Sequence, residues 1–97
     1  MTSGETARAS YQLTVSTTAL RLVASNYAGP LPNRAIFTVE GASVRLRYDG
    51  VDPTADEGHK LDSGQTATLE GTQNIAAAKL IRDGSSDAPV FVTLEAP

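Results

Sequence analysis

The sequence predicts a small all-β domain, an antiparallel β-sandwich or barrel of about seven to eight short strands with a flexible N-terminal arm. Short runs in which apolar and polar residues alternate recur roughly every ten residues along the chain. Turn-forming glycine, proline, aspartate and asparagine separate these runs, and no long stretch has the period of an amphipathic helix. The 97 residues are expected to form one domain, because hydrophobic cores divide only in much longer chains.

The chain is predicted to divide into a flexible arm, residues 1–9, and a single β-sandwich domain, residues 10–97. The arm is small, polar and aperiodic, so it offers a core little to bury. From residue 10 onward the alternation of apolar and polar residues predicts a first strand, and residues 18–24 predict a second. The apolar side chains of the first strand are Tyr11, Leu13 and Val15.

The middle of the chain is predicted to contain a loop followed by a hairpin. Residues 26–33 include two prolines and a glycine, which do not fit a central strand, and predict the loop. Residues 34–40 are apolar on both faces, as in a strand in the middle of a sheet. A tight-turn signal follows at Gly41 and Ala42, and the amphipathic run 43–48 then predicts a hairpin partner for residues 34–40.

The second half of the chain begins with a predicted acidic loop, residues 49–58, which contains Asp-Gly and Asp-Pro pairs. Residues 75–82 are ambiguous, because the alanines favour a helix while the flanking turns leave little room for one, so we expect a short turn and then a strand through Ile81. Further strands are expected at residues 59–61, 66–70 and 89–95. The inward-facing side chains of this half and of the 43–48 run are Val44, Leu46, Tyr48, Ala67, Leu69, Val90, Val92 and Leu94.

The composition argues against several classes of protein. A net charge of −3 without a basic stripe argues against nucleic-acid binding. No apolar run approaches the length of a membrane-spanning helix, and the N-terminus lacks an apolar signal core, so we expect a soluble protein that does not enter a membrane. The absence of cysteine excludes a disulfide scaffold and thiolate metal ligands.

Catalytic chemistry has little support in the sequence. His59 is the only histidine, and we expect it to be structural or solvated. Ser63, Ser85 and Ser86 lie in turn-forming loops, and none lies in a nucleophile-elbow pattern. We therefore predict a protein that is not an enzyme, with no catalytic, cofactor-binding or metal-binding residues and no cofactor.

The acidic loop contains oxygen ligands of the kind that calcium prefers, at Asp49, Asp52, Asp56 and Glu57. Their spacing does not match an EF-hand loop. We expect a charged loop that does not bind calcium tightly, and calcium binding is the alternative. On the polar face of the preceding strand, the arginines at positions 45 and 47 are expected to pair with carboxylates of the same fold.

Sugar binding is a further possibility for a small β-sandwich, because flat aromatic rings stack on sugar rings. The chain has no tryptophan and few aromatic residues. Tyr27, in its Pro/Gly loop, is expected to be exposed. The aromatic residues at strand positions are expected to be in the core, and they are Tyr11, Phe37, Tyr48 and Phe91.

One segment of the chain has a distinctive order of residues. Residues 45–54 read Arg-Leu-Arg-Tyr-Asp-Gly-Val-Asp-Pro-Thr, and Gly58-His59-Lys60-Leu61 and Gly64 follow. This order resembles a pattern found in small phage structural proteins. The likeness extends loosely over residues 35–93. Such proteins are similar to decoration, cement or tail-associated components of virions, and the resemblance implies no catalytic residue.

From this resemblance we expect a non-enzymatic virion structural protein that decorates or cements a phage capsid lattice and is made in the host cytoplasm. Its partners would be the major capsid protein or other virion proteins, and it would act as a homo-oligomer or in many copies on the lattice, with the arm as a latch. The alternative is a phage tail or fibre module that binds a host-surface glycan or protein. A metal-dependent hydrolase fragment is a third possibility, which would need a clustered metal site.

Overall fold

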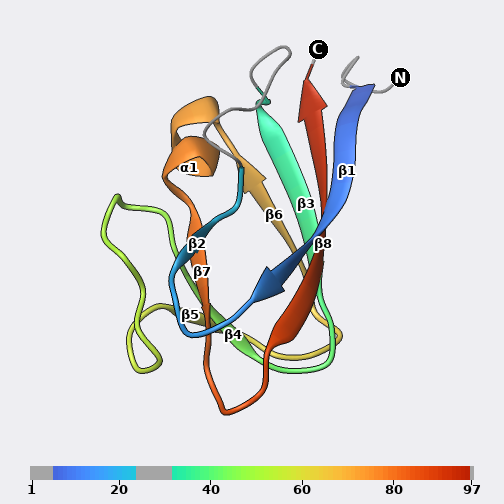
Figure 1. Cartoon of the computed structure of the whole chain (residues 1–97). Coiled ribbons are helices and arrows are strands. Elements are labelled where there is room, and N and C mark those ends of the chain that lie inside the picture. The colour runs from blue at the N-terminus through green and yellow to red at the C-terminus, as the bar shows by residue number, and fades with distance from the viewer. Residues whose placement is uncertain (1–5, 24–31, 97) are drawn as a thin grey trace.

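In the computed structural model, which describes residues 6–23 and 32–96, eight strands form two four-stranded antiparallel sheets, accompanied by one short helix (Figure 1). The first sheet has the order β1-β8-β3-β6, with β1 at Thr6–Val15, β8 at Ala88–Ala96, β3 at Arg34–Val39 and β6 at Thr66–Glu70. The second has the order β2-β7-β4-β5, with β2 at Leu20–Arg21, β7 at Lys79–Arg82, β4 at Val44–Arg47 and β5 at His59–Leu61. The predicted small all-β sandwich is confirmed.

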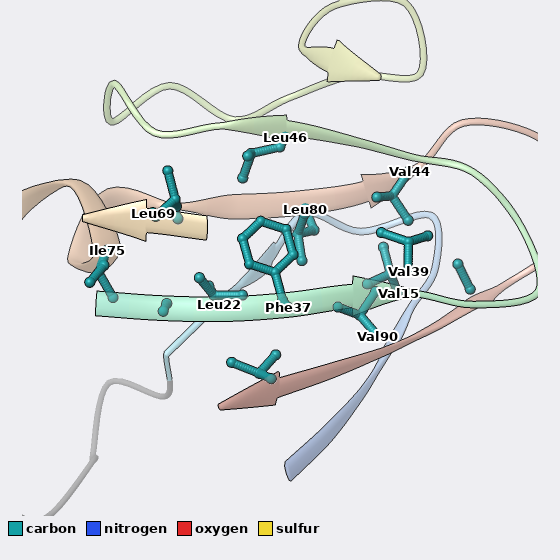
Figure 2. Packing of buried hydrophobic residues seen from close by; sticks show 14 of the residues in the cluster. Val15, Leu22, Phe37, Val39, Val44, Leu46, Leu69, Ile75, Leu80 and Val90 are labelled. Carbon is teal, nitrogen blue, oxygen red and sulfur yellow. The ribbon is translucent and has the colours of Figure 1, made fainter. Parts of the chain in front are cut away.

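The core lies between the inner faces of the two sheets. Figure 2 shows the ring of Phe37 pointing from β3 toward Leu46 and Leu80 of the second sheet. The inward alternation predicted for β4, β6 and β8 is confirmed at the following buried residues: Val44, Leu46, Leu69, Val90, Val92 and Leu94. Because each strand alternates, the opposite set of side chains faces solvent.

β3 lies between β8 and β6, as its two-sided apolar composition predicts. It does not, however, form a hairpin with β4, so that prediction is wrong. β4 belongs to the other sheet, and the turn at Gly41 and Ala42 is the corner at which the chain passes between sheets. Gly41 has φ +78°, and the backbone N–H of Glu40 donates to the carbonyl of Pro89. The alternation of apolar and polar residues indicates which side chains face inward, but it does not indicate which strand is the partner. The same alternation is therefore found whether two consecutive strands form a hairpin or belong to different sheets.

The flexible arm predicted for residues 1–9 extends too far. β1 begins at Thr6, and Thr6, Ala7 and Ala9 pair with the end of β8, with a bulge between Ala7 and Ala9 (Figure 1). Residues 1–5 lie outside the described residues. The correction has a physical reason: residues 6–9 are held by backbone pairing to a strand at the other end of the chain, which their own sequence, Thr-Ala-Arg-Ala, does not reveal.

A six-residue helix, α1 at Thr72–Ala77, stands where a short turn was expected, so the turn is wrong, while β7 confirms the strand through Ile81. The helix fits between the flanking turns because it also includes residues 72–74, which precede the ambiguous segment. Ile75 of α1 is buried in the core. The strand predicted over 18–24 is limited to the two residues of β2, which pair with Leu80 and Lys79 of β7. The predicted loop at 26–33 falls mostly outside the described residues. Within the described part of the chain, no helix is long and apolar enough to cross a membrane.

Candidate functional site

The outer face of the first sheet carries a nearly uncharged surface, which we call the Phe91 face. Phe91 is at its centre with 46% of its surface exposed. The strand register places Gln12 and Thr38 on either side of Phe91, with Thr66 beyond Thr38. The neighbouring row across the same four strands consists of Ser10, Thr93, Ile36 and Thr68.

Hydroxyl groups on the Phe91 face bond to one another across the strands. The hydroxyls of Ser10 and Thr93 are 3.0 Å apart, and those of Thr38 and Thr66 are also 3.0 Å apart. Charged groups gather at one end of the sheet, where Arg34 lies 3.6 Å from a carboxylate oxygen of Glu95 and 3.8 Å from one of Glu70. The described side chains in the middle of this face are therefore uncharged, and four of its hydroxyls are paired with one another.

The prediction that Phe91 belongs to the core is wrong. Val90 and Val92 point inward, so the residue between them on β8 must point outward. That alternation is visible in the sequence and could have identified the exposed ring. Phe37 is in the core as predicted, Tyr11 is partly buried and donates its hydroxyl to the carbonyl of Leu22 at 2.5 Å, and Tyr27 lies outside the described residues.

A second surface, which we call the Tyr48 hollow, lies beside the acidic loop at one end of the second sheet. Tyr48 was also predicted to be buried, but β4 ends at Arg47, and Tyr48 is 38% exposed beyond it. Its ring stacks on that of His59, with centroids 5.9 Å apart and an angle of 22° between the ring planes. The hollow has a volume of about 570 Å³, and its lining residues are Arg47, Tyr48, Asp49, Glu57, Gly58 and His59.

The strand pairing brings the two sides of the Tyr48 hollow together. Leu46 of β4 pairs with His59 of β5, so the residues that follow Leu46 face those that precede His59. Gly58 lies where β5 comes close to β4, and its φ is +138°. A Cβ at this position would lie 3.1 Å from the Cβ of Arg45 and 3.1 Å from the carbonyl oxygen of Leu46. A glycine is therefore required at residue 58 for β4 and β5 to meet in this way.

Arg47 and Asp49 form a two-point ion pair at the edge of the hollow. Arg47 donates from Nε to Asp49 Oδ1 at 3.1 Å and from Nη2 to Oδ2 at 2.5 Å. The backbone N–H of Val51 also donates to Asp49 Oδ1, at 3.3 Å. The hydrogen bonds from Arg47 are the main reason that the pKa of Asp49 is lowered to about 2, so the carboxylate is ionised at neutral pH.

The other acidic residues of the loop do not converge. Asp52 pairs with Lys79 at 2.6 Å, and the backbone N–H groups of Asp56 and Glu57 donate to the hydroxyl of Thr54. No hydrogen bond or ion pair within residues 6–23 and 32–96 uses the Glu57 carboxylate. The same residues contain no group of three or more side chains placed to hold a metal ion. That the loop does not bind calcium tightly stays a prediction, which a calorimetric titration would test.

Both arginines on the polar face of β4 pair with carboxylates of the same fold, as predicted. Arg45 Nε lies 2.8 Å from Asp83 Oδ1, and this hydrogen bond lowers the pKa of Asp83. Arg47 pairs with Asp49 as described above. The serines considered for catalysis lie in exposed turns of the structure, Ser63 between β5 and β6, and Ser85 and Ser86 between β7 and β8. His59 contacts Tyr48 instead of a serine.

The fold and these surfaces define a small antiparallel β-sandwich, whose described residues form two exposed aromatic regions, one on each sheet. Comparison with protein-family models, with curated proteins and with solved structures finds no match to this chain. Any assignment of function therefore rests on the chemistry of the Phe91 face and the Tyr48 hollow, together with the resemblance noted from the sequence.

Proposed function

We propose that this chain is a non-enzymatic virion structural protein that decorates or cements a phage capsid lattice through its Phe91 face. The observation that carries the proposal is the exposure of Phe91, 46% of whose surface is open at the centre of an uncharged sheet face. A large aromatic side chain in the middle of such a surface is a typical anchor of a protein–protein contact. Its partner would be the major capsid protein or another virion protein.

The hydroxyls around Phe91 lower the free-energy cost of removing water from this face when a partner binds. Covering a polar group costs free energy when its hydrogen bonds to water are lost and not replaced. Ser10 bonds to Thr93 and Thr38 bonds to Thr66, so these hydroxyls keep a partner when water is excluded. Arg34, at one end of this sheet face, is close to Glu70 and Glu95, which favours a neutral protein surface as the partner over nucleic acid.

The virion setting is supported by the resemblance of residues 45–54 and the glycines that follow them to small phage structural proteins. A single small face gives weak binding, but many copies on a lattice multiply weak contacts through avidity. The chain would then act in multiple copies after synthesis in the host cytoplasm. The alternative, a tail or fibre module that binds a host-surface glycan or protein, would place the chain on tails instead of capsids.

The test is binding of purified protein to capsids stripped of the native chain. We expect Phe91→Ser to reduce affinity for the capsid roughly 30-fold, which corresponds to the loss of an anchor worth about 2 kcal/mol. Val51→Ser is the matched control, because Val51 is 50% exposed in a loop away from the first sheet, and it should leave binding unchanged. Equal capsid occupancy by the Phe91→Ser variant and the unmodified chain would overturn the proposal, and enrichment on isolated tails would favour the alternative.

A further inference from the structure

We propose that the Tyr48 hollow is a binding site for a neutral pyranose sugar. Neither Phe91 nor the first sheet takes part in this site, so the inference stands independently of the proposed capsid function. It rests on three features of residues 47–59: an exposed aromatic stack, hydrogen-bonding groups of both kinds beside it, and a concave surface held in place by the fold.

The first feature is the aromatic stack. Tyr48 and His59 are both exposed, and the 22° angle between their rings makes them a nearly parallel pair. The stack covers the facing sides of the two rings, so the surface offered to a ligand is the outward side of a ring. This flat apolar surface next to polar edges matches the apolar C–H face and polar rim of a pyranose. Because Tyr48 lies just after β4 and His59 begins β5, the pairing of these two strands fixes the stack.

The second feature is the mixture of donors and acceptors. The Glu57 carboxylate is an acceptor, and the Tyr48 hydroxyl is a donor and an acceptor, and neither takes part in a hydrogen bond within the described part of the chain. Arg47 gives Nε and one Nη2 hydrogen to Asp49 and keeps its Nη1 group to donate elsewhere. A sugar hydroxyl both donates and accepts, so neighbouring hydroxyls of one ring can satisfy groups of both kinds.

The charges favour a neutral ligand. Because Arg47 and Asp49 neutralise each other, Glu57 leaves the hollow with a net negative charge, which would repel an anion. A cation could approach Glu57 but would leave the donors of Arg47 and Tyr48 unpaired as it covered them. A neutral polyhydroxylated ring avoids both costs.

The third feature is the shape and rigidity of the site. Its volume of about 570 Å³ lies within the ~300–1,000 Å³ range of small-molecule sites. The two-point ion pair holds Arg47, and the glycine at residue 58 holds the opposite wall close to β4. Because the hollow is open to solvent, binding of a single sugar ring is expected to be weak, with dissociation constants in the millimolar range.

The experiment uses the full chain and a panel of methyl glycosides of glucose, galactose, mannose and N-acetylglucosamine. We expect at least one of them to show saturation transfer from the protein in NMR, with amide shift changes confined to residues 47–49 and 57–59. Tyr48→Ala should abolish the saturation transfer, and Glu57→Gln should weaken binding several-fold, while both variants keep the amide spectrum of the folded chain elsewhere. Phe91→Ala, which removes an exposed ring from the other sheet, should bind as the unmodified chain does.

Two further probes test the choice of ligand. Methylguanidinium, a cation, and inorganic phosphate, an anion, should not shift the same amides at the concentrations at which the sugar does. If no glycoside of the panel binds at tens of millimolar, if Tyr48→Ala binds undiminished, or if either ion perturbs residues 47–59 more than the sugars do, the proposal is wrong. A failure here leaves the capsid-binding experiment unaffected, because that experiment depends on Phe91.

Discussion

Leu46 is 4% exposed in β4, and its side chain belongs to the cluster that joins the two sheets (Figure 2). Truncation to alanine removes apolar contacts and leaves a cavity that a small, closely packed core fills only in part. We expect Leu46→Ala to reduce the free energy of unfolding by about 2–5 kcal/mol, measured by denaturant unfolding. Val51→Ala, in an exposed loop, should change it by less than about 0.5 kcal/mol. A Leu46→Ala variant as stable as the unmodified chain would contradict this packing.

Asp49 makes the stability of the folded chain depend on pH in the acid range. Its pKa falls from the ordinary 3.8 to about 2 in the folded chain, mainly because Arg47 donates hydrogen bonds to the carboxylate. Since the folded pKa is the lower one, the unfolded chain binds protons first as the pH falls, and folding loses this contribution. The contribution is complete above about pH 4 and is lost as the pH falls toward 2.

This acid dependence can be measured by NMR titration of the Asp49 carboxyl and by unfolding at several pH values. We expect a titration midpoint near 2 in the unmodified chain and one closer to 3.8 in Arg47→Gln. Asp49→Asn should lose less stability than the unmodified chain between pH 4 and pH 2. A midpoint near 3.8 in the unmodified chain would show that the ion pair does not persist in solution.

Among the elements, the pairing of β1 with β8 has the clearest consequence. The sequence predicts that residues 6–9 belong to a flexible arm, yet Thr6, Ala7 and Ala9 pair with β8. Backbone hydrogen bonds contribute about 0.5–1.5 kcal/mol each, so deleting residues 1–9 should cost about 2–4 kcal/mol and lower the melting temperature. Deletion of residues 1–5 is the control, since it leaves every described strand pair in place. If both truncated chains have the same melting temperature as the full chain, the start of β1 contributes nothing to stability.

At the scale of the whole molecule, the first and last strands are neighbours, and the two sheets share one core. Loss of either sheet would expose the apolar face of the other, so neither is expected to be stable alone. We therefore expect one cooperative unfolding transition. Far-UV circular dichroism and tyrosine fluorescence, which reports on the three tyrosines in a chain without tryptophan, should give the same midpoint. Two separate transitions would show that the sheets unfold independently.

The inner and outer faces of most strands could be predicted from the sequence. Alternation is a local property, and it correctly placed Leu46, Leu69 and Val92 inside because a strand presents successive side chains to opposite faces. Turn residues marked most of the strand ends for a similar reason, since glycine and proline act on their own backbone. The same rule, applied to β8, would have placed Phe91 outside, where it forms the centre of the proposed capsid-binding face.

The partners of each strand were decided only by the tertiary structure. β1 pairs with β8 across nearly the whole chain, and β3 and β4 separate into different sheets although a short turn joins them. The Tyr48 hollow also depends on strand pairing, because Tyr48 contacts His59 only when β4 pairs with β5. The physical reason is that inward and outward orientation follows from neighbouring residues, whereas strand pairing depends on the free energy of the whole core, which no local pattern contains.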